Sequence, residues 1–310
     1  MSISEIIKTG RKYRVCYDST PGAKKWYRLS HWTHASDVEF DDQKKLSEVL
    51  ATNTREETTS IIRYVNQNGG SDSNDGKSEN TPYLTIQRAI DDALLVIGNT
   101  EFIIKVKGGT SVDSPMHYHN FVVKNTSITL EIDGNIVIGG AALTNSSECL
   151  IEVDSATLKV TSKNGLDDSR NPKDSINVHS ENNYQKGILI YVHNGGMVNV
   201  YQTTLRLIGN GSGDNGNTGI YVVSNGGFAS TTSNISFRHV VSAVIVSTNS
   251  NFYADGLYEN KDSDSNSNIK YGIICSNGGQ VAYGINNIAV IPGGILEQTS
   301  NGGRIYTGSQ

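Results

Sequence analysis

A short phrase that recurs in the second half of the chain constrains the fold more than any other feature. An apolar strand leads into Asn-Gly-Gly three times, with the asparagines at positions 194, 225 and 277, and a weaker copy has its asparagine at 249. Because Asn and Gly tolerate positive φ, each phrase predicts a strand that ends in a sharp corner. Recurrence at intervals of 31, 24 and 28 residues predicts supersecondary units that stack on one another.

The segments on both sides of the corner alternate between apolar and polar residues, as half-buried strands do. Strand, corner and strand repeated in one direction predict the coil of a parallel β-helix, because antiparallel neighbours seldom reuse one turn at the same end of the same strand. An antiparallel meander is the remaining alternative. The places that we align are Val192, Val223 and Cys275 before the corner, and Val198, Ala229 and Val281 after it.

Composition agrees with a solenoid of short strands and excludes several classes of partner. The 310 residues are 36% hydrophobic, with 32 Gly and 5 Pro, and carry a net charge of −5. A mildly acidic β-rich chain argues against nucleic acid or an anionic membrane as the partner. No apolar run approaches the ~20 residues of a membrane span, and the N-terminus lacks the apolar core of a signal peptide, so no membrane insertion is expected. Three widely spaced cysteines, at 16, 149 and 275, lack a zinc-ligand pattern and predict reduced, mostly buried thiols.

The N-terminal part divides into two segments before the solenoid. Residues 1–37 predict a small β region, with strands near 13–17 and 26–32 joined by a turn at Pro21-Gly22. Residues 38–60 predict a short amphipathic helix and a linker. A lone helix with nothing on its own chain to pack against favours three helices around an axis, and therefore a homotrimer. The alternative is a helix that folds back on the hairpin.

Residues 61–100 predict a strand, a polar loop and a capped helix, followed by the β-helical body and C-terminal tip in 101–310. Thr85 and Thr81 are the N-cap candidates. The expected buried face of the helix consists of Ile86, Ala89, Ile90, Ala93 and Leu94.

Two segments resemble known families. Residues 64–90 resemble the opening segment of right-handed β-helix proteins of the pectate-lyase-like superfamily, in which the helix closes the N-terminal end of the solenoid. Residues 11–15 and 26–42 resemble the N-terminal attachment region of tail fibres and receptor-binding proteins of bacteriophages and related contractile particles, and residues 302–308 resemble their endings. The resemblance implies an all-β fold: a trimeric, right-handed parallel β-helix with a capping helix, preceded by a β-hairpin and helix for attachment. The attachment residues that it implies are Trp26, Arg28, Trp32 and Asp37.

Three polar insertions, at 163–186, 209–218 and 255–270, each precede a strand of the Gly-Ile type. Insertions at one corner of successive coils make a continuous surface, and polar side chains with tyrosines suit the binding of sugars. Solvated loops without a ligand are the alternative. The expected receptor-binding residues are Asp167, Asp168, Asn171, Tyr184, Asp214, Asn215, Tyr258 and Asp262.

The sequence does not identify a catalytic or metal-binding site as clearly as it identifies the fold. Glycoside hydrolysis needs a pair of carboxylates, but the loops hold many acids without singling out two, and the strand acids Glu131 and Glu152 are isolated. We assign no catalytic residue and expect no cofactor. His117 and His119 share a face if their segment is extended, and a threefold axis would then gather six imidazoles for a metal. Pro115 favours a loop instead, so we predict no metal there.

The resemblance implies a tail fibre protein of a virion tail, assembled in the cytoplasm of a bacterial host. Its N-terminus would attach to baseplate or tail proteins, and its body would bind a bacterial surface receptor, either a glycan or a protein. A tailspike depolymerase, acting as a glycosidase or lyase on capsule or lipopolysaccharide, is the alternative. A structural fibre segment that carries another receptor-binding tip is a third possibility.

Overall fold

A computed structural model of the chain divides into two compact units, Met1–Glu57 and Thr58–Gln310. The structure describes residues 3–9, 12–17, 25–29, 60–94, 101–139, 148–180, 187–209, 216–259 and 269–307, with the backbone alone in the first three ranges.

The first unit contains an antiparallel sheet of three described strands in the order β1-β2-β3. The predicted hairpin is confirmed, because β2 (Lys12–Tyr17) pairs with β3 (Lys25–Leu29) in antiparallel register. The strand β1 (Ile3–Thr9) pairs with the other edge of β2 and was not predicted. The predicted helix after Asp37 lies outside the described residues.

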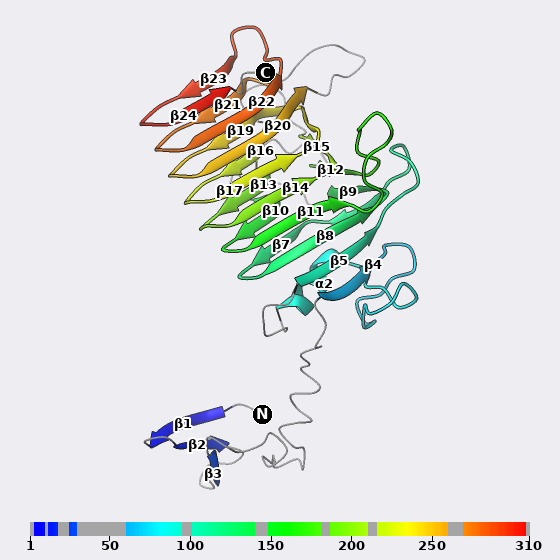
Figure 1. Cartoon of the computed structure of the whole chain (residues 1–310), viewed down its shortest axis with the longest axis vertical. Helices are drawn as coiled ribbons and strands as arrows, with labels where there is room; N and C mark the ends of the chain where they lie inside the picture. Colours follow the sequence, from blue (N-terminus) through cyan, green and yellow to red (C-terminus); the bar gives the residue numbers. More distant parts are fainter. Residues whose placement is uncertain are drawn as a thin grey trace. The chain divides into compact units, whose positions relative to one another are not determined.

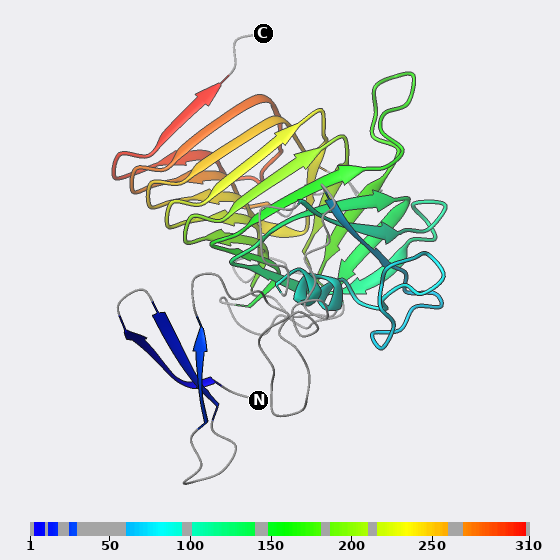
Figure 2. The same ribbon diagram turned by 60° about the horizontal axis from the view of Figure 1, so that its bottom comes forward.

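The second unit is a solenoid of parallel strands with three faces (Figures 1 and 2). In the described part, its first and second faces belong to one sheet of fourteen strands and its third face is a sheet of seven. The first face contains β4 (Ser60–Val65), β5 (Glu101–Lys107), β8 (Ser127–Asp133), β11 (Thr157–Ser162), β14 (Met197–Tyr201), β17 (Gly227–Thr231), β20 (Asn251–Glu259), β22 (Gln280–Asn287) and β24 (Arg304–Thr307). The second contains β6 (Met116–His119), β9 (Asn135–Gly139), β12 (Ser175–His179), β15 (Thr204–Ile208) and β18 (Ile235–Arg238). The third contains β7 (Phe121–Lys124), β10 (Cys149–Asp154), β13 (Ile188–His193), β16 (Asn217–Val222), β19 (Val240–Val246), β21 (Tyr271–Cys275) and β23 (Ile295–Thr299).

The strand β20 joins the first two faces. Its first half pairs with β17 and its second half with β18, so one strand runs across the boundary between faces. The described strands of successive coils in this unit all pair in parallel, which confirms a parallel β-helix-like fold and excludes the antiparallel meander.

The core runs along the inside of the solenoid because alternate residues of each strand point inward. On β10, Ile151 and Val153 are 4% and 0% exposed, whereas Glu152 between them is partly exposed. Each fully buried aliphatic side chain of this kind contributes about 1.5–3 kcal/mol of hydrophobic stabilisation. The inward side chains of the three faces form one continuous cluster.

The recurrent corner joins the third face to the first in successive coils. Its first two residues both have positive φ, as in Asn194 (52°) with Gly195 (76°) and Ser224 (55°) with Asn225 (62°). The corners also continue the ladder of hydrogen bonds between coils, since Gly195 N donates to Ser224 O at 2.9 Å. The sequence Asn301-Gly302 is a further corner of this type, which was not predicted.

The predicted alignment of the repeats is wrong by one residue in the second copy. Val192 pairs with Val222 rather than Val223, and Val198 pairs with Phe228 rather than Ala229. The reason is that Asn225 takes the second positive-φ position of its corner, whereas Asn194 takes the first. Asn and Gly both tolerate positive φ at either position of the corner, so the Asn-Gly-Gly motif alone does not fix the register of the strands.

The predicted insertion at 163–186 is wrong as a single loop, because it includes a different corner, the one between the first and second faces. The strand β12 lies within that segment, and residues 163–174 form the corner that precedes β12. The carboxylate of Asp174, which is 2% exposed, organises this corner. It accepts hydrogen bonds from Gly134 N, from both nitrogens of Asn164, and from Ser162 Oγ at 2.5 Å. The predicted insertion at 255–270 also begins within a strand, because β20 extends to Glu259.

The helix α2 (Ile86–Ala93) begins as predicted, with the side chain of Thr85 accepting a hydrogen bond from Arg88 N. Four of the five expected apolar residues are buried, but Leu94 is 50% exposed because it lies at the C-cap, beyond the last turn. The helix contacts β4, β5 and β7 and lies beside the first strands of the solenoid (Figure 2). That it closes the solenoid end stays a prediction.

Cys149 and Cys275 are free thiols, with Cys275 buried and Cys149 partly buried. No helix in the described ranges combines the length and apolar character needed to cross a membrane.

Candidate functional site

The third face of the solenoid brings titratable side chains together from separate coils. Glu152 and Asp154 occupy alternate outward positions of β10, because Ile151 and Val153 take the inward ones. The parallel register of β10 and β13 places Asp154 directly beside His193 and Glu152 beside Tyr191.

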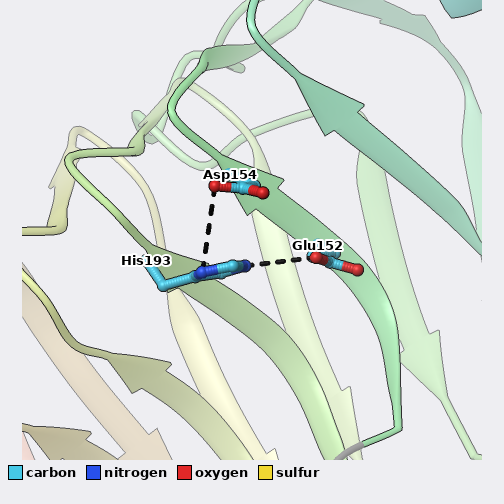
Figure 3. A group of neighbouring side chains, drawn as sticks. All are labelled: Glu152, Asp154 and His193. Atoms are coloured by element: carbon cyan, nitrogen blue, oxygen red, sulfur yellow. Dashed lines mark hydrogen bonds and ion pairs between the residues drawn. The ribbon is translucent and has the colours of Figure 1, made fainter.

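Both ring nitrogens of His193 face carboxylates (Figure 3). His193 Nε2 lies 3.1 Å from Glu152 Oε1, and Nδ1 lies 3.9 Å from Asp154 Oδ1. The exposed fractions of the three side chains are 14%, 21% and 23% for His193, Glu152 and Asp154, so each is partly shielded and still reachable from solvent.

Lys124, on the neighbouring strand β7, completes what we call the His193 cluster: Lys124, Glu152, Asp154 and His193. Its Nζ lies 3.2 Å from Glu152 Oε1 and 3.9 Å from Asp154 Oδ2. The hydrogen bond to Glu152 and the attraction of its charge raise the pKa of Lys124. Hydrogen bonds from Asn194 Nδ2 and Ser155 Oγ outweigh partial burial and lower the pKa of Asp154. The cluster therefore holds the two carboxylates of β10 between the ammonium of Lys124 on β7 and the imidazole of His193 on β13.

Aromatic rings extend the cluster along the solenoid axis. The ring of Tyr191 stacks on that of His193, with centroids 4.4 Å apart and planes 16° from parallel. Tyr221, one coil further, lies 5.6 Å from Tyr191 between ring centroids. Burial is the main cause that raises the pKa of Tyr191, so its hydroxyl stays protonated and can donate a hydrogen bond.

Cys149, at the start of β10, is not a nucleophile in this arrangement. Burial first, and then the charge of Glu152, raise the pKa of its thiol to about 12. The reactive thiolate is therefore scarce at neutral pH.

Glu152, Asp154 and His193 also offer one possible ligand set for a metal ion, because one ligand atom from each lies within 4.8 Å of the others. Two carboxylates and an imidazole suit a divalent transition metal. Lys124 already supplies a positive charge to Glu152 at 3.2 Å, where such an ion would bind. The arrangement fits hydrogen bonding to a polar ligand and proton transfer through His193 better than it fits a metal centre.

The predicted receptor-binding residues in the loop before β12 have different surroundings. Asp167 Oδ1 accepts hydrogen bonds from the backbone nitrogens of Ser169 and Asn171, at 2.9 and 2.8 Å. The bond from Asn171 is the main cause that lowers the pKa of Asp167. Its carboxylate therefore shapes its own turn, and Asp167, Asp168 and Asn171 are all exposed.

Tyr258 lies on β20 rather than in a loop, on the outward side of the second face. It is in register with Ser236 on one side and Asn287 on the other. His117 and His119 also lie on a strand, β6, although Pro115 favoured a loop. They are exposed on either side of the buried Tyr118, as expected for an extended segment.

The other predicted residues cannot be placed in full. Trp26 and Arg28 belong to β3, where they pair with Cys16 and Arg14 of β2, and only their backbone is described. The residues outside the described ranges are Tyr184, Asp214, Asn215, Asp262, Trp32 and Asp37.

Sequence reasoning missed the His193 cluster because it treated Glu152 as an isolated acid. The signal available was the corner itself. Asp154 immediately precedes the corner residue Ser155, which has a φ of 52°, just as His193 precedes Asn194. Aligning these two corners places Asp154 beside His193 one coil later.

Comparison with known proteins gives little further information. No protein-family model and no curated protein matches the sequence. Among solved structures, the native protein of a GH136 lacto-N-biosidase from Eubacterium ramulus is similar over 79% of this chain and 68% of that chain, with 9% sequence identity and a TM-score of 0.24. A likeness at this level carries no argument about activity.

Proposed function

We propose that this chain is a tail fibre protein that binds a bacterial surface glycan through the outward faces of its solenoid. Its N-terminal unit would attach to the baseplate or tail proteins of a phage-like particle. The attachment role rests on the resemblance of residues 11–15 and 26–42, and the separate compact unit Met1–Glu57 is consistent with it.

The observation that carries glycan binding is the His193 cluster with its adjoining tyrosine rings. Sugars offer many hydroxyl groups and apolar ring faces, so their sites combine hydrogen-bonding side chains with aromatic rings. Glu152 and Asp154 supply acceptors, Lys124 supplies donors, and Tyr191 and Tyr221 supply the rings. All of them lie on the outward side of one sheet, where an extended polymer has access.

Binding of purified capsule or lipopolysaccharide fragments, followed by biolayer interferometry, tests this role. Glu152→Gln keeps the size of the side chain and removes the charge, and we expect it to weaken binding at least tenfold. Glu131→Gln is the matched control, since Glu131 is also an outward glutamate paired with a lysine, Lys105 at 3.6 Å, but lies on the first face. Equal binding by the two variants would contradict the proposal.

The depolymerase alternative is favoured by one feature, the two carboxylates that flank an imidazole in the same cluster. General acid–base catalysis on a glycosidic bond uses groups of this kind. Loss of polysaccharide cleavage in Glu152→Gln with binding retained would identify an enzyme. Binding without any chain shortening would favour an adhesin.

The homotrimer is a separate part of the proposal. Light scattering of the full chain is expected to give three times the 33.5 kDa of one chain. A mass of one chain would contradict the fibre assignment.

A further inference from the structure

A cleft of about 180 Å³ lies at the beginning of the first face, beside the end of β4 and the loop that follows it. Its charged and aromatic lining consists of Tyr64, Glu79, Lys105, Lys107, Asp133 and Lys163. These residues come from three neighbouring strands, the loop after β4 and the residue that follows β11. The cleft is on a different face from the His193 cluster.

Two ammonium groups meet at one carboxylate oxygen within this cleft. Lys107 Nζ and Lys163 Nζ each lie 2.9 Å from Asp133 Oδ2, so they lie within twice that distance of one another. The register of the sheet produces this contact, because Lys107 is paired directly with Asp133 on the next strand. The three residues form an alternating row of charge across successive coils.

Asp133 remains ionised and cannot neutralise both lysines. Burial opposes its ionisation, but hydrogen bonds from Lys163, Lys107 and Asn164 outweigh burial and lower its pKa to about 2. One carboxylate therefore accepts from two ammonium groups, and each ammonium has further N–H donors. The lysine side chains are 54% and 46% exposed, so these donors are accessible.

A third lysine, Lys105, also lines the cleft and has a carboxylate partner of its own, Glu131. Lys105 Nζ lies 3.6 Å from Glu131 Oε1, beyond a good hydrogen bond, and 5.9 Å from the centre of the Tyr64 ring. Glu131 balances Lys105, Lys107 and Lys163 share the single carboxylate of Asp133, and Glu79 is the other carboxylate of the lining. The two ammonium groups that share one carboxylate favour an anion as the ligand.

We propose that this cleft binds a small anionic group carried by a compact polar ligand about the size of one sugar unit. Its volume is below the range of about 300–1,000 Å³ typical of sites for larger ligands, which suits a single unit rather than a polymer. Lys107 and Lys163 bind the anion, and Tyr64 forms one wall. The anion is a carboxylate or a phosphate, which share this recognition chemistry. The proposal is independent of the fibre assignment and of the His193 cluster.

Isothermal titration of the full chain with D-glucuronate, inorganic phosphate and neutral D-glucose tests the site. We expect one or both anions to bind, glucose not to bind, and the double variant Lys107→Gln/Lys163→Gln to bind at least tenfold more weakly. Binding of glucuronate alone assigns a sugar carboxylate, and binding of phosphate alone assigns a phosphate. The matched control is Lys159→Gln, an exposed lysine of β11 on the same face but outside the cleft.

Asp133→Asn provides a second test with the opposite sign. Removing the resident carboxylate frees both lysines, so we expect anion affinity to rise at least threefold, and to fall again with added salt. If Lys107, Asp133 and Lys163 form ion pairs with no ligand-binding role, neither the wild type nor Asp133→Asn will bind an anion. That result, or equal binding by the double-lysine variant, would overturn the proposal.

Discussion

Asp174 and the pair of Glu152 and Asp154 belong to the same solenoid but have opposite surroundings. Asp174 is 2% exposed and accepts four hydrogen bonds, three from Ser162 and Asn164 of its own coil and one from Gly134 of the preceding coil. Glu152 and Asp154 are 21% and 23% exposed and face a lysine and a histidine from other coils. A buried carboxylate with all its acceptor sites filled stabilises a structure, whereas partly exposed acids around an imidazole retain the capacity to bind or react.

The largest expected effect is the loss of stability on removing the buried acid. Asp174→Ala leaves the donors of Gly134, Ser162 and Asn164 without their acceptor, so we expect a loss of about 3 kcal/mol or more. Denaturant unfolding measures the change. The control Asp168→Ala removes an exposed acid from the same loop and is expected to stay within about 0.5 kcal/mol of wild type. Similar losses of stability in Asp174→Ala and Asp168→Ala would contradict the structural role that we assign to the buried carboxylate.

The corner residue Gly196 packs closely against the strand that carries two acids of the His193 cluster. A Cβ on Gly196 would lie 2.5 Å from the carbonyl oxygen of Val153, the residue between Glu152 and Asp154. Gly196→Ala must displace that strand and is expected to cost about 1–3 kcal/mol. It should also shift the NMR resonances of His193. A control is Gly293→Ala, where the added Cβ meets no atom within 4 Å but the positive φ of 80° adds strain of its own. Unchanged His193 resonances in Gly196→Ala would contradict the coupling.

Asp133 lies between the two extremes, because it is partly exposed but strongly paired. Its folded-state pKa of about 2 is below the unfolded value, so its contribution is present above pH ~4 and is lost as the pH falls towards 2. The expected contribution is up to about 2 kcal/mol. Asp133→Asn should therefore reduce the loss of stability between pH 4 and pH 2. An identical pH profile for wild type and variant would show that the pairing does not affect folding.

The smallest stability effect is expected in the His193 cluster itself. Glu152→Gln removes an ion pair of partly exposed groups and should change unfolding free energy by no more than about 1 kcal/mol. It should lower the pKa of Lys124, since the bond to Glu152 is the main cause that raises it. NMR titration of the lysine measures this change, with Lys124 in Glu131→Gln as the control. A large loss of stability with an unchanged Lys124 would assign Glu152 to structure.

Local features of the chain were predictable and distant ones were not. The corners and the start of α2 follow from Asn, Gly and Thr at particular positions, because backbone preferences and caps act over a few residues. The strand β12 was hidden within a polar segment, and the one-residue offset at Asn225 arose because Asn and Gly accept the same backbone conformation. Errors of this kind move side chains to another corner or to the opposite side of a sheet.

The sequence by itself determined that this protein forms parallel coils with a sharp recurrent corner. The reason is that the alternation of apolar residues and the positions of residues that tolerate positive φ can both be seen in the sequence. Tertiary structure alone decided which side chains of different coils meet. His193 and Glu152 are separated by 41 residues and meet because β10 and β13 pair in one register. Lys107 and Lys163 meet at Asp133 for the same reason. The number of residues in each coil varies, so spacing in the sequence does not identify these pairs. The hydrogen bonds between paired strands set the register and therefore decide which side chains meet.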